Sequence, residues 1–166
     1  MKKSIAVFLV ILFLVLVLFS VRLFSSREID DVSPQIPCED KYLMKSNILW
    51  VVPNYNNISI SSNKEWCRRI SGLNKEIGLH GVTHEFEEFG IDRSSEYLSV
   101  GVKSFIECFG FIPDSFKPPQ LVISEENENL IKTSEMELKG RLNQITHKVY
   151  HCDDAGIFPN WFIDLF

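Results

Sequence analysis

The sequence NILWVV, residues 47–52, is an almost continuous apolar run closed by Pro53 and Asn54. This pattern is typical of a β-strand covered on both faces, because neither set of alternating side chains then meets water. REIDDV at residues 27–32 and EIGLHG at residues 76–81 are strand candidates on either side of it. Strands covered on both faces occur mainly in parallel sheets, so the run points to an α/β fold.

Helical patterns alternate with these strands. NKEWCRRISGLNK (63–75) and SSEYLSVGVKSFIECF (94–109) repeat apolar residues at helical spacing; Asn63 is a suitable N-cap for the first, and Gly110 stands where the C-cap glycine of the second belongs. Further along we expect a strand in DSFKPP (114–119), a helix in SEENENLIKTSEM (124–136) and a last strand in NQITHKVYH (143–151). This alternation predicts a mainly parallel sheet or barrel, whose reacting groups gather at the C-terminal ends of the strands.

The first 27 residues do not fit this domain. Lys2 and Lys3 precede an uncharged run from Ser4 to Val21, which Arg22 and further polar residues close. With the next two apolar residues the run is long enough to cross a bilayer as a helix. A cleaved signal peptide is the alternative, but the run is long for one and no small-x-small cleavage pattern follows it. We therefore expect an uncleaved, single-pass anchor (1–27) with a cytoplasmic N-terminus, and a domain (28–166) outside the cytoplasm.

Charge and cysteine content exclude some classes of function. A net charge of −5 without clustered Lys and Arg argues against a nucleic-acid partner. The 4 cysteines form no CxxC pair, so a zinc-finger type of structural site is not expected. In an exported domain they could form disulfides in three alternative full pairings, or remain buried as thiols; the sequence leaves this open.

Two groups of residues have the chemistry of a metal site. His80 and His84 are spaced so that on a helix both imidazoles would share one face and one metal ion. Asp30 and Asp31 end a predicted strand, where alternating side chains would let one carboxylate ligate the metal while the other stays beside it. On its own, each group has a simpler interpretation: the two histidines could be ordinary ones, and the two aspartates could form a solvated acidic turn. Only the combination of both groups predicts a metal site.

That combination resembles the polysaccharide deacetylases, the NodB-homology carbohydrate de-N-acetylases and esterases. The motifs that carry the resemblance are IDDVSP (29–34), LHGVTH (79–84) and FKPP (116–119), in the family's order, and it covers residues 28–166. It is nearest to a poorly characterised branch with DDVSP and HGxTH motifs. The fold that it implies is a distorted (β/α) barrel, which agrees with the alternation of strands and helices.

The family pattern implies roles for five residues. Asp31, His80 and His84 become the ligands of a divalent metal, most simply zinc, and Asp30 becomes the general base. Such a metal lowers the pKa of bound water and polarises an acetyl carbonyl. Lys117 stands where the family has an arginine that orients the base, and it offers a point charge without the bidentate fork. FKPP alone would be read as a loop that ends a strand.

The family also uses a late histidine as general acid for the leaving amine. His147 and His151 are both candidates and would share one face of a regular strand. We prefer His151, because the following residues suggest a strand end turning into a loop, with Asp153 as a partner that orients the imidazole.

Some features depart from the family. Gly81 stands where many members have Ser or Thr, and few residues follow His151, so we expect an incomplete barrel. The aromatic residues of FPNWFIDLF (158–166) are expected to pack a last helix onto the sheet rather than to stack on sugars. Trp50 and Trp66 are expected in the core.

The resemblance implies a metal-dependent hydrolase that removes acetyl or related acyl groups from an amino sugar or a cell-surface glycan. The alternative is a catalytically inactive, membrane-tethered domain of the same fold that binds carbohydrate or acts as a scaffold.

Overall fold

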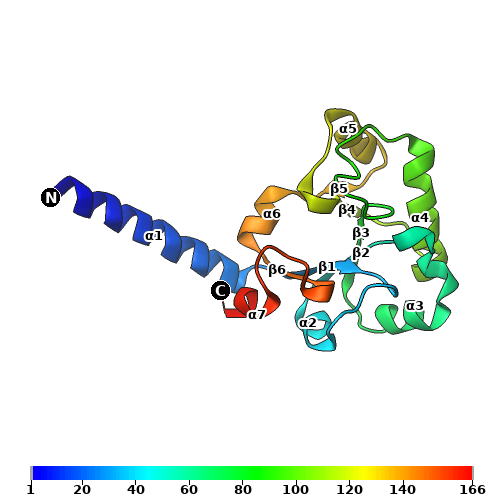
Figure 1. Cartoon of the computed structure of the whole chain (residues 1–166), viewed down its shortest axis with the longest axis horizontal. Helices are drawn as coiled ribbons and strands as arrows, with labels where there is room; N and C mark the ends of the chain where they lie inside the picture. The colour runs from blue at the N-terminus through cyan, green and yellow to red at the C-terminus, as the bar shows by residue number, and fades with distance from the viewer. Residues whose placement is uncertain (1, 166) are drawn as a thin grey trace.

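A computed structural model of the chain describes residues 2–165, which form one long helix followed by an α/β domain (Figure 1). Helix α1 (Lys2–Phe24) extends away from the domain, and its C-terminal end meets it. Within α1, the segment Lys3–Phe24 is long and apolar enough to cross a membrane, and none of it is buried inside the protein.

The centre of the domain is a fully parallel sheet. Within residues 2–165 it has 6 strands in the order β5-β4-β3-β2-β1-β6. The edge strands β5 and β6 are not paired with each other in the described part of the chain, so the sheet is open. The fold is therefore the incomplete α/β barrel that the sequence predicts. The strands are β1 (Arg27–Val32), β2 (Ile48–Val51), β3 (Glu76–His80), β4 (Ser115–Lys117), β5 (Glu137–Leu138) and β6 (Lys148–His151).

The helices begin and end close to the expected signals. The side chain of Asn63 caps the first turn of α3, and Gly110 ends α4 at φ 83°, a left-handed conformation that glycine adopts without a Cβ clash. Ser94 and Ser124 cap α4 and α5 in the same way as Asn63 caps α3. The α-helices that follow α1 are α2 (Asp40–Lys45), α3 (Lys64–Ser71), α4 (Ser95–Phe109), α5 (Glu125–Thr133), α6 (Arg141–Thr146) and α7 (Asn160–Leu165).

The core forms around the run that opened the sequence. All residues of β2 are buried, and Trp50 is fully so. Trp66 is half-buried and packs against the same core. Burial on both faces explains why the run has no polar residue in alternate positions.

The expected strand over residues 143–151 is wrong in its first half. Residues up to Thr146 form α6, and His147 is the C-cap of that helix. Among residues 2–165, strand β6 pairs only with β1, and that pairing begins at Arg27 opposite Lys148. Since the chain before Arg27 leaves the sheet as α1, residues ahead of Lys148 have no strand to pair with in this part of the chain.

The expected packing of the C-terminal aromatic residues is also largely wrong. Helix α7 forms, but Phe158, Trp161 and Leu165 are 53%, 61% and 64% exposed, whereas Ile163 packs against the core. Phe166 lies outside the described residues. Polar bonds hold α7 instead: the Tyr150 hydroxyl donates to Asp164 at 2.9 Å, and the Asn160 amide donates to the His151 carbonyl at 2.7 Å. The helix therefore leaves an apolar surface exposed.

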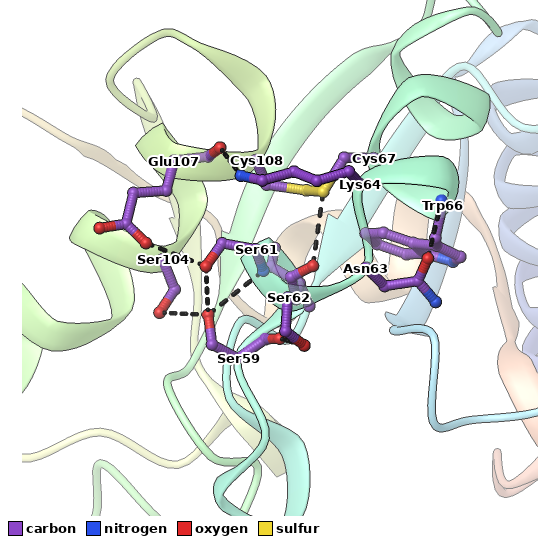
Figure 2. Close-up of a disulfide and its surroundings, with 11 residues drawn as sticks. Ser59, Ser61, Ser62, Asn63, Lys64, Trp66, Cys67, Ser104, Glu107 and Cys108 are labelled. Atoms are coloured by element: carbon purple, nitrogen blue, oxygen red, sulfur yellow. Dashed lines mark hydrogen bonds between the residues drawn. A yellow bond between two sulfur atoms is a disulfide. The ribbon is translucent and has the colours of Figure 1, made fainter.

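Two disulfides fix the pairing that the sequence left open. Cys38–Cys152 ties the segment after β1 to the end of β6, and Cys67–Cys108 joins α3 to α4. Figure 2 shows the second one beside hydrogen bonds from the turn that precedes α3 to α4: from Ser59 to Ser104 at 3.0 Å and from Ser61 to Glu107 at 2.9 Å.

We predict that the Cys67→Ser/Cys108→Ser double variant loses stability without losing its fold. The cross-link closes a loop with a sequence separation of 41, for which chain entropy predicts a loss of about 4 kcal/mol. Thermal unfolding followed by circular dichroism should give a melting temperature lower by roughly 10 °C, at about 2–4 °C per kcal/mol. An unchanged melting temperature under non-reducing conditions would show that the bond does not form.

Candidate metal centre

Polar side chains from three strands converge at one rim of the sheet. Asp30 and Asp31 come from the end of β1, His80 from the end of β3 and His151 from the end of β6. They line a cavity of about 670 Å³. In a parallel sheet all C-terminal strand ends lie at one edge, so residues distant in sequence meet there.

A bulge in β1 turns both aspartates toward this cavity. The pairing of β1 with β2 shifts register between Ile29 and Val32, and Asp31 has φ 65°. Asp is among the few residues that tolerate the left-handed region. Regular alternation would separate the two carboxylates, so the bulge, which the sequence did not reveal, is what brings both to one site.

Asp31, His80 and His84 lie close enough to share one cation. Their ligand atoms are all within 4.8 Å of one another; Oδ1 of Asp31 is 3.3 Å from Nε2 of His80 and 2.8 Å from Nε2 of His84. Around a tetrahedral zinc ion, ligand atoms lie roughly 3.3 Å apart. Two imidazoles and one carboxylate are also a donor set that zinc favours, so the residues fit the metal.

The orientation of the His80 ring also fits a metal site. Its Nδ1 is 2.9 Å from the backbone carbonyl of Lys117, to which it can only donate. In the neutral ring Nε2 then carries the lone pair, and that nitrogen faces Asp31. A ligand histidine whose second nitrogen is held by a carbonyl is the usual arrangement at a metal centre.

His84 reaches the site from a loop, not from the helix that its spacing suggested. Gly81 and His84 both have φ 64°, and the carboxylate of the fully buried Glu88 accepts the backbone N–H groups of Val82, Thr83 and His84 at 2.8–3.1 Å. Through these hydrogen bonds Glu88 holds the loop in its folded conformation. Nothing in the sequence distinguished it from the neighbouring exposed glutamates.

Gly81 is required by the closeness of that loop. A Cβ at this position would lie 2.3 Å from Oε2 of Glu88 and 2.6 Å from Cγ of Pro119. The glycine that departs from the family pattern therefore fits a tightly packed, left-handed turn in this chain.

Lys117 is fully buried and holds Asp30 from behind. Its Nζ lies 2.8 Å from Oδ1 of Asp30 and 3.3 Å from Oε2 of Glu28. Glu28, which the sequence analysis missed, also accepts bonds from Nε1 of Trp50 at 2.7 Å and from Nδ1 of His147. The cation and the two carboxylates form a closed network beneath the rim, as burial of charge demands.

The two late histidines have different places. His151 lines the cavity, and its Nδ1 lies 3.1 Å from Oδ2 of Asp31. His147 binds Glu28 and does not line the cavity. Asp153, the suggested partner of His151, is exposed, and Asp31 has that role instead.

Asp31 is the electrostatic centre of the group. Burial opposes its ionisation, but the hydrogen bonds from His151, His80 and His84 outweigh burial and hold the pKa of Asp31 far below its usual range. Burial lowers the pKa values of His84 and His151, but the Asp31 carboxylate more than reverses this and raises both. A carboxylate that stays ionised is suited to bind a cation.

The chain is similar to several solved structures. No family model and no curated protein matches the sequence. Among solved structures, BA3943, a CE4 family pseudoenzyme from Bacillus anthracis, aligns with a TM-score of 0.51 and 15% identity over 68% of this chain and 41% of that one. The polysaccharide deacetylase Bc1974 from Bacillus cereus aligns with a TM-score of 0.52 and 10% identity over 75% of this chain and 76% of that one.

This chain therefore spans about two fifths of the length of the pseudoenzyme and three quarters of that of the deacetylase. At these identities the likeness concerns the fold. The chain has the fold of the CE4 polysaccharide deacetylases, as the sequence resemblance predicted.

We predict that Lys117→Ala destabilises the domain by about 3–5 kcal/mol, because it leaves two buried carboxylates without their cation. Chemical denaturation should give this difference in unfolding free energy. Lys103→Ala is the matched control: its side chain is 78% exposed and should contribute less than about 0.5 kcal/mol. Equal effects of both substitutions would contradict the network.

Gly81→Ala should lower the unfolding free energy by at least about 2 kcal/mol, through the left-handed backbone and the contact with Glu88. Gly140→Ala is the control, since a Cβ there meets nothing within 4 Å. Stability of the Gly81 variant equal to wild type would mean that the loop is not packed as described.

Proposed function

We propose that this protein is a membrane-anchored, metal-dependent hydrolase that removes acetyl or a related acyl group from an amino sugar or glycan. One observation carries the proposal: an Asp-His-His donor set lies at a strand rim beside a second carboxylate and a third histidine. The fold of the deacetylases supports it, since their reaction needs such a constellation.

Asp31, His80 and His84 would hold a divalent cation, most simply zinc. When bound, the cation would supply a Lewis acid for the acyl carbonyl and lower the pKa of water near it. Three protein ligands leave a coordination position open, as a catalytic site requires.

Asp30 is the proposed general base. It lies beside the ligand Asp31 and is fixed through Oδ1 by Lys117, so that Oδ2 remains to take a proton from the attacking water. Lys117 acts as a positioning residue in the place of the family's arginine.

His151 is the proposed general acid. Its Nδ1 is engaged by Asp31, which leaves Nε2 as the nitrogen that protonates the departing amine. Hydrolysis of an amide needs this proton, because an amide anion is a poor leaving group.

We further propose that residues 1–27 anchor the domain (28–166) in the membrane, with the N-terminus cytoplasmic and the domain outside. The length and apolarity of α1 support the span, and two disulfides support an oxidising compartment for the domain.

The second candidate is an inactive, tethered carbohydrate-binding or scaffolding domain. Lys117 favours it, because the buried ammonium occupies one oxygen of Asp30 while it is also shared with Glu28. The solved neighbour BA3943, described as a pseudoenzyme, illustrates that this fold exists without activity.

Metal content tests the donor set. We predict about one zinc per chain for the purified protein and less than a tenth of that for His80→Ala and His84→Ala, because two remaining donors bind weakly. His147→Ala is the histidine control and should keep its metal, since His147 binds Glu28. Equal metal content in all four proteins would contradict the site.

Turnover separates the two candidates. The zinc-loaded protein should hydrolyse N-acetylated sugars, and Asp30→Asn should lower kcat by roughly 100-fold or more with its metal retained. Full metal occupancy without turnover on acetylated sugars or aryl acetates would reject the hydrolase in favour of the inactive domain.

A further inference from the structure

The cavity at the candidate site has two ends of opposite chemistry. One end holds the aspartates and histidines described above. The wall leading away from them is aliphatic and aromatic, and part of it comes from the proposed membrane helix. Its residues include Leu18, Leu121, Ile145, Ile157, Phe158 and Ile163. A sugar chain presents hydroxyl groups that need polar partners, so this wall suits a hydrocarbon better than a second sugar.

An arginine lies in the same cavity. Arg22 stands at the end of α1, and its Nη1 donates to the carbonyl of Ile145 at 3.2 Å. Its Nε is buried and has no hydrogen-bond partner among residues 2–165, and the ion pairs of this part of the chain do not include Arg22. A buried donor on an uncompensated cation is suited to an anion, and a guanidinium binds phosphate especially well.

The surface around this cavity is apolar and adjoins α1. Helix α6 contacts the end of α1 where it meets the domain (Figure 1), and Ile163 of α7 lines the same cavity as Leu18 and Arg22 of α1. The exposed apolar residues of this surface, here called the rim patch, are Leu142, Ile145, Ile157, Phe158, Trp161 and Leu165. Apolar and aromatic side chains next to a membrane-spanning helix are typical of a surface that lies on the bilayer.

We propose that the substrate is an amphiphile of the membrane: an N-acylated amino sugar joined through a phosphate group to a hydrocarbon chain. The inference rests on the proposed hydrolase and names its substrate class. The acylated sugar lies at the aspartates and histidines, the phosphate at Arg22, and the chain along the aliphatic wall and Leu18 toward the bilayer.

The reaction is hydrolysis at the sugar and leaves the lipid linkage intact. Water adds across the acyl carbon–nitrogen bond: the carbon keeps the oxygen as a carboxylic acid, and the nitrogen takes the proton and leaves as the amine. The phosphate serves only for binding.

Binding of defined probes tests the substrate class independently of turnover. The full chain in detergent micelles, carrying Asp30→Asn, would be titrated with citronellyl phosphate-linked N-acetylglucosamine, with N-acetylglucosamine 1-phosphate, and with citronellyl N-acetylglucosaminide. We expect the first probe to bind at least tenfold more tightly than either of the others, which lack the chain or the phosphate.

Variants locate the two contacts. Arg22→Ala should weaken binding of the first probe tenfold to a hundredfold, the loss expected for a charged hydrogen bond, whereas Arg27→Ala, exposed at the start of β1, should not. Ile145→Asn should weaken it as well, whereas Ile91→Asn, 62% exposed and outside the cavity, should not.

The outcomes separate this inference from the hydrolase. Tight binding of the amphiphile that depends on Arg22, without hydrolysis by the zinc-loaded wild type, supports the inferred ligand class and its contacts and rejects the hydrolase. The opposite outcome is that water-soluble acetylated sugars are hydrolysed as fast as the amphiphile, and that Arg22→Ala leaves the ratio of the two kcat/KM values unchanged. That outcome supports the hydrolase and overturns the inference.

Discussion

The candidate site depends on one buried carboxylate that faces three imidazoles. Asp31 is held in a left-handed conformation that costs about 1–2 kcal/mol for a residue with a Cβ, and its contacts with His80, His84 and His151 offset that cost. The bulge that produces this conformation also keeps Asp30 in the same cavity. The strained bulge in β1 thus also places the two carboxylates of the site. Backbone strain of this kind is common at functional sites.

Two buried polar groups behind the site keep this arrangement rigid. Lys117 joins Asp30 to Glu28, and Glu88 gathers the backbone N–H groups of the loop that carries His84. Both groups are fully buried, so protein atoms must satisfy their polar atoms, and that requirement fixes the positions of the side chains they hold. The rim patch has the opposite character: it is apolar and exposed, and it adjoins α1 and the mouth of the same cavity. The site thus combines a buried polar floor with an apolar entrance.

The sequence predicted the parallel sheet, most of its strands and helices, and the convergence of the Asp and His motifs, because these depend on periodicity and on the common edge of parallel strands. It did not predict the bulge at Asp31 or the loop at His84, since a single left-handed residue leaves no periodic signal. Glu28 and Glu88 were missed because a buried acid looks like an exposed one until its partners are known. The error at residues 143–147 came from propensity: β-branched residues favoured a strand, but β1 offers none of its length for pairing there.

Anomalous diffraction at the zinc absorption edge, from crystals of the full chain grown with zinc, tests the central claim most directly. The account predicts one anomalous peak within about 2.0–2.2 Å of Asp31 Oδ1 and of Nε2 of both His80 and His84. A zinc peak elsewhere, or well-ordered side chains at Asp31, His80 and His84 with no peak between them, would contradict it.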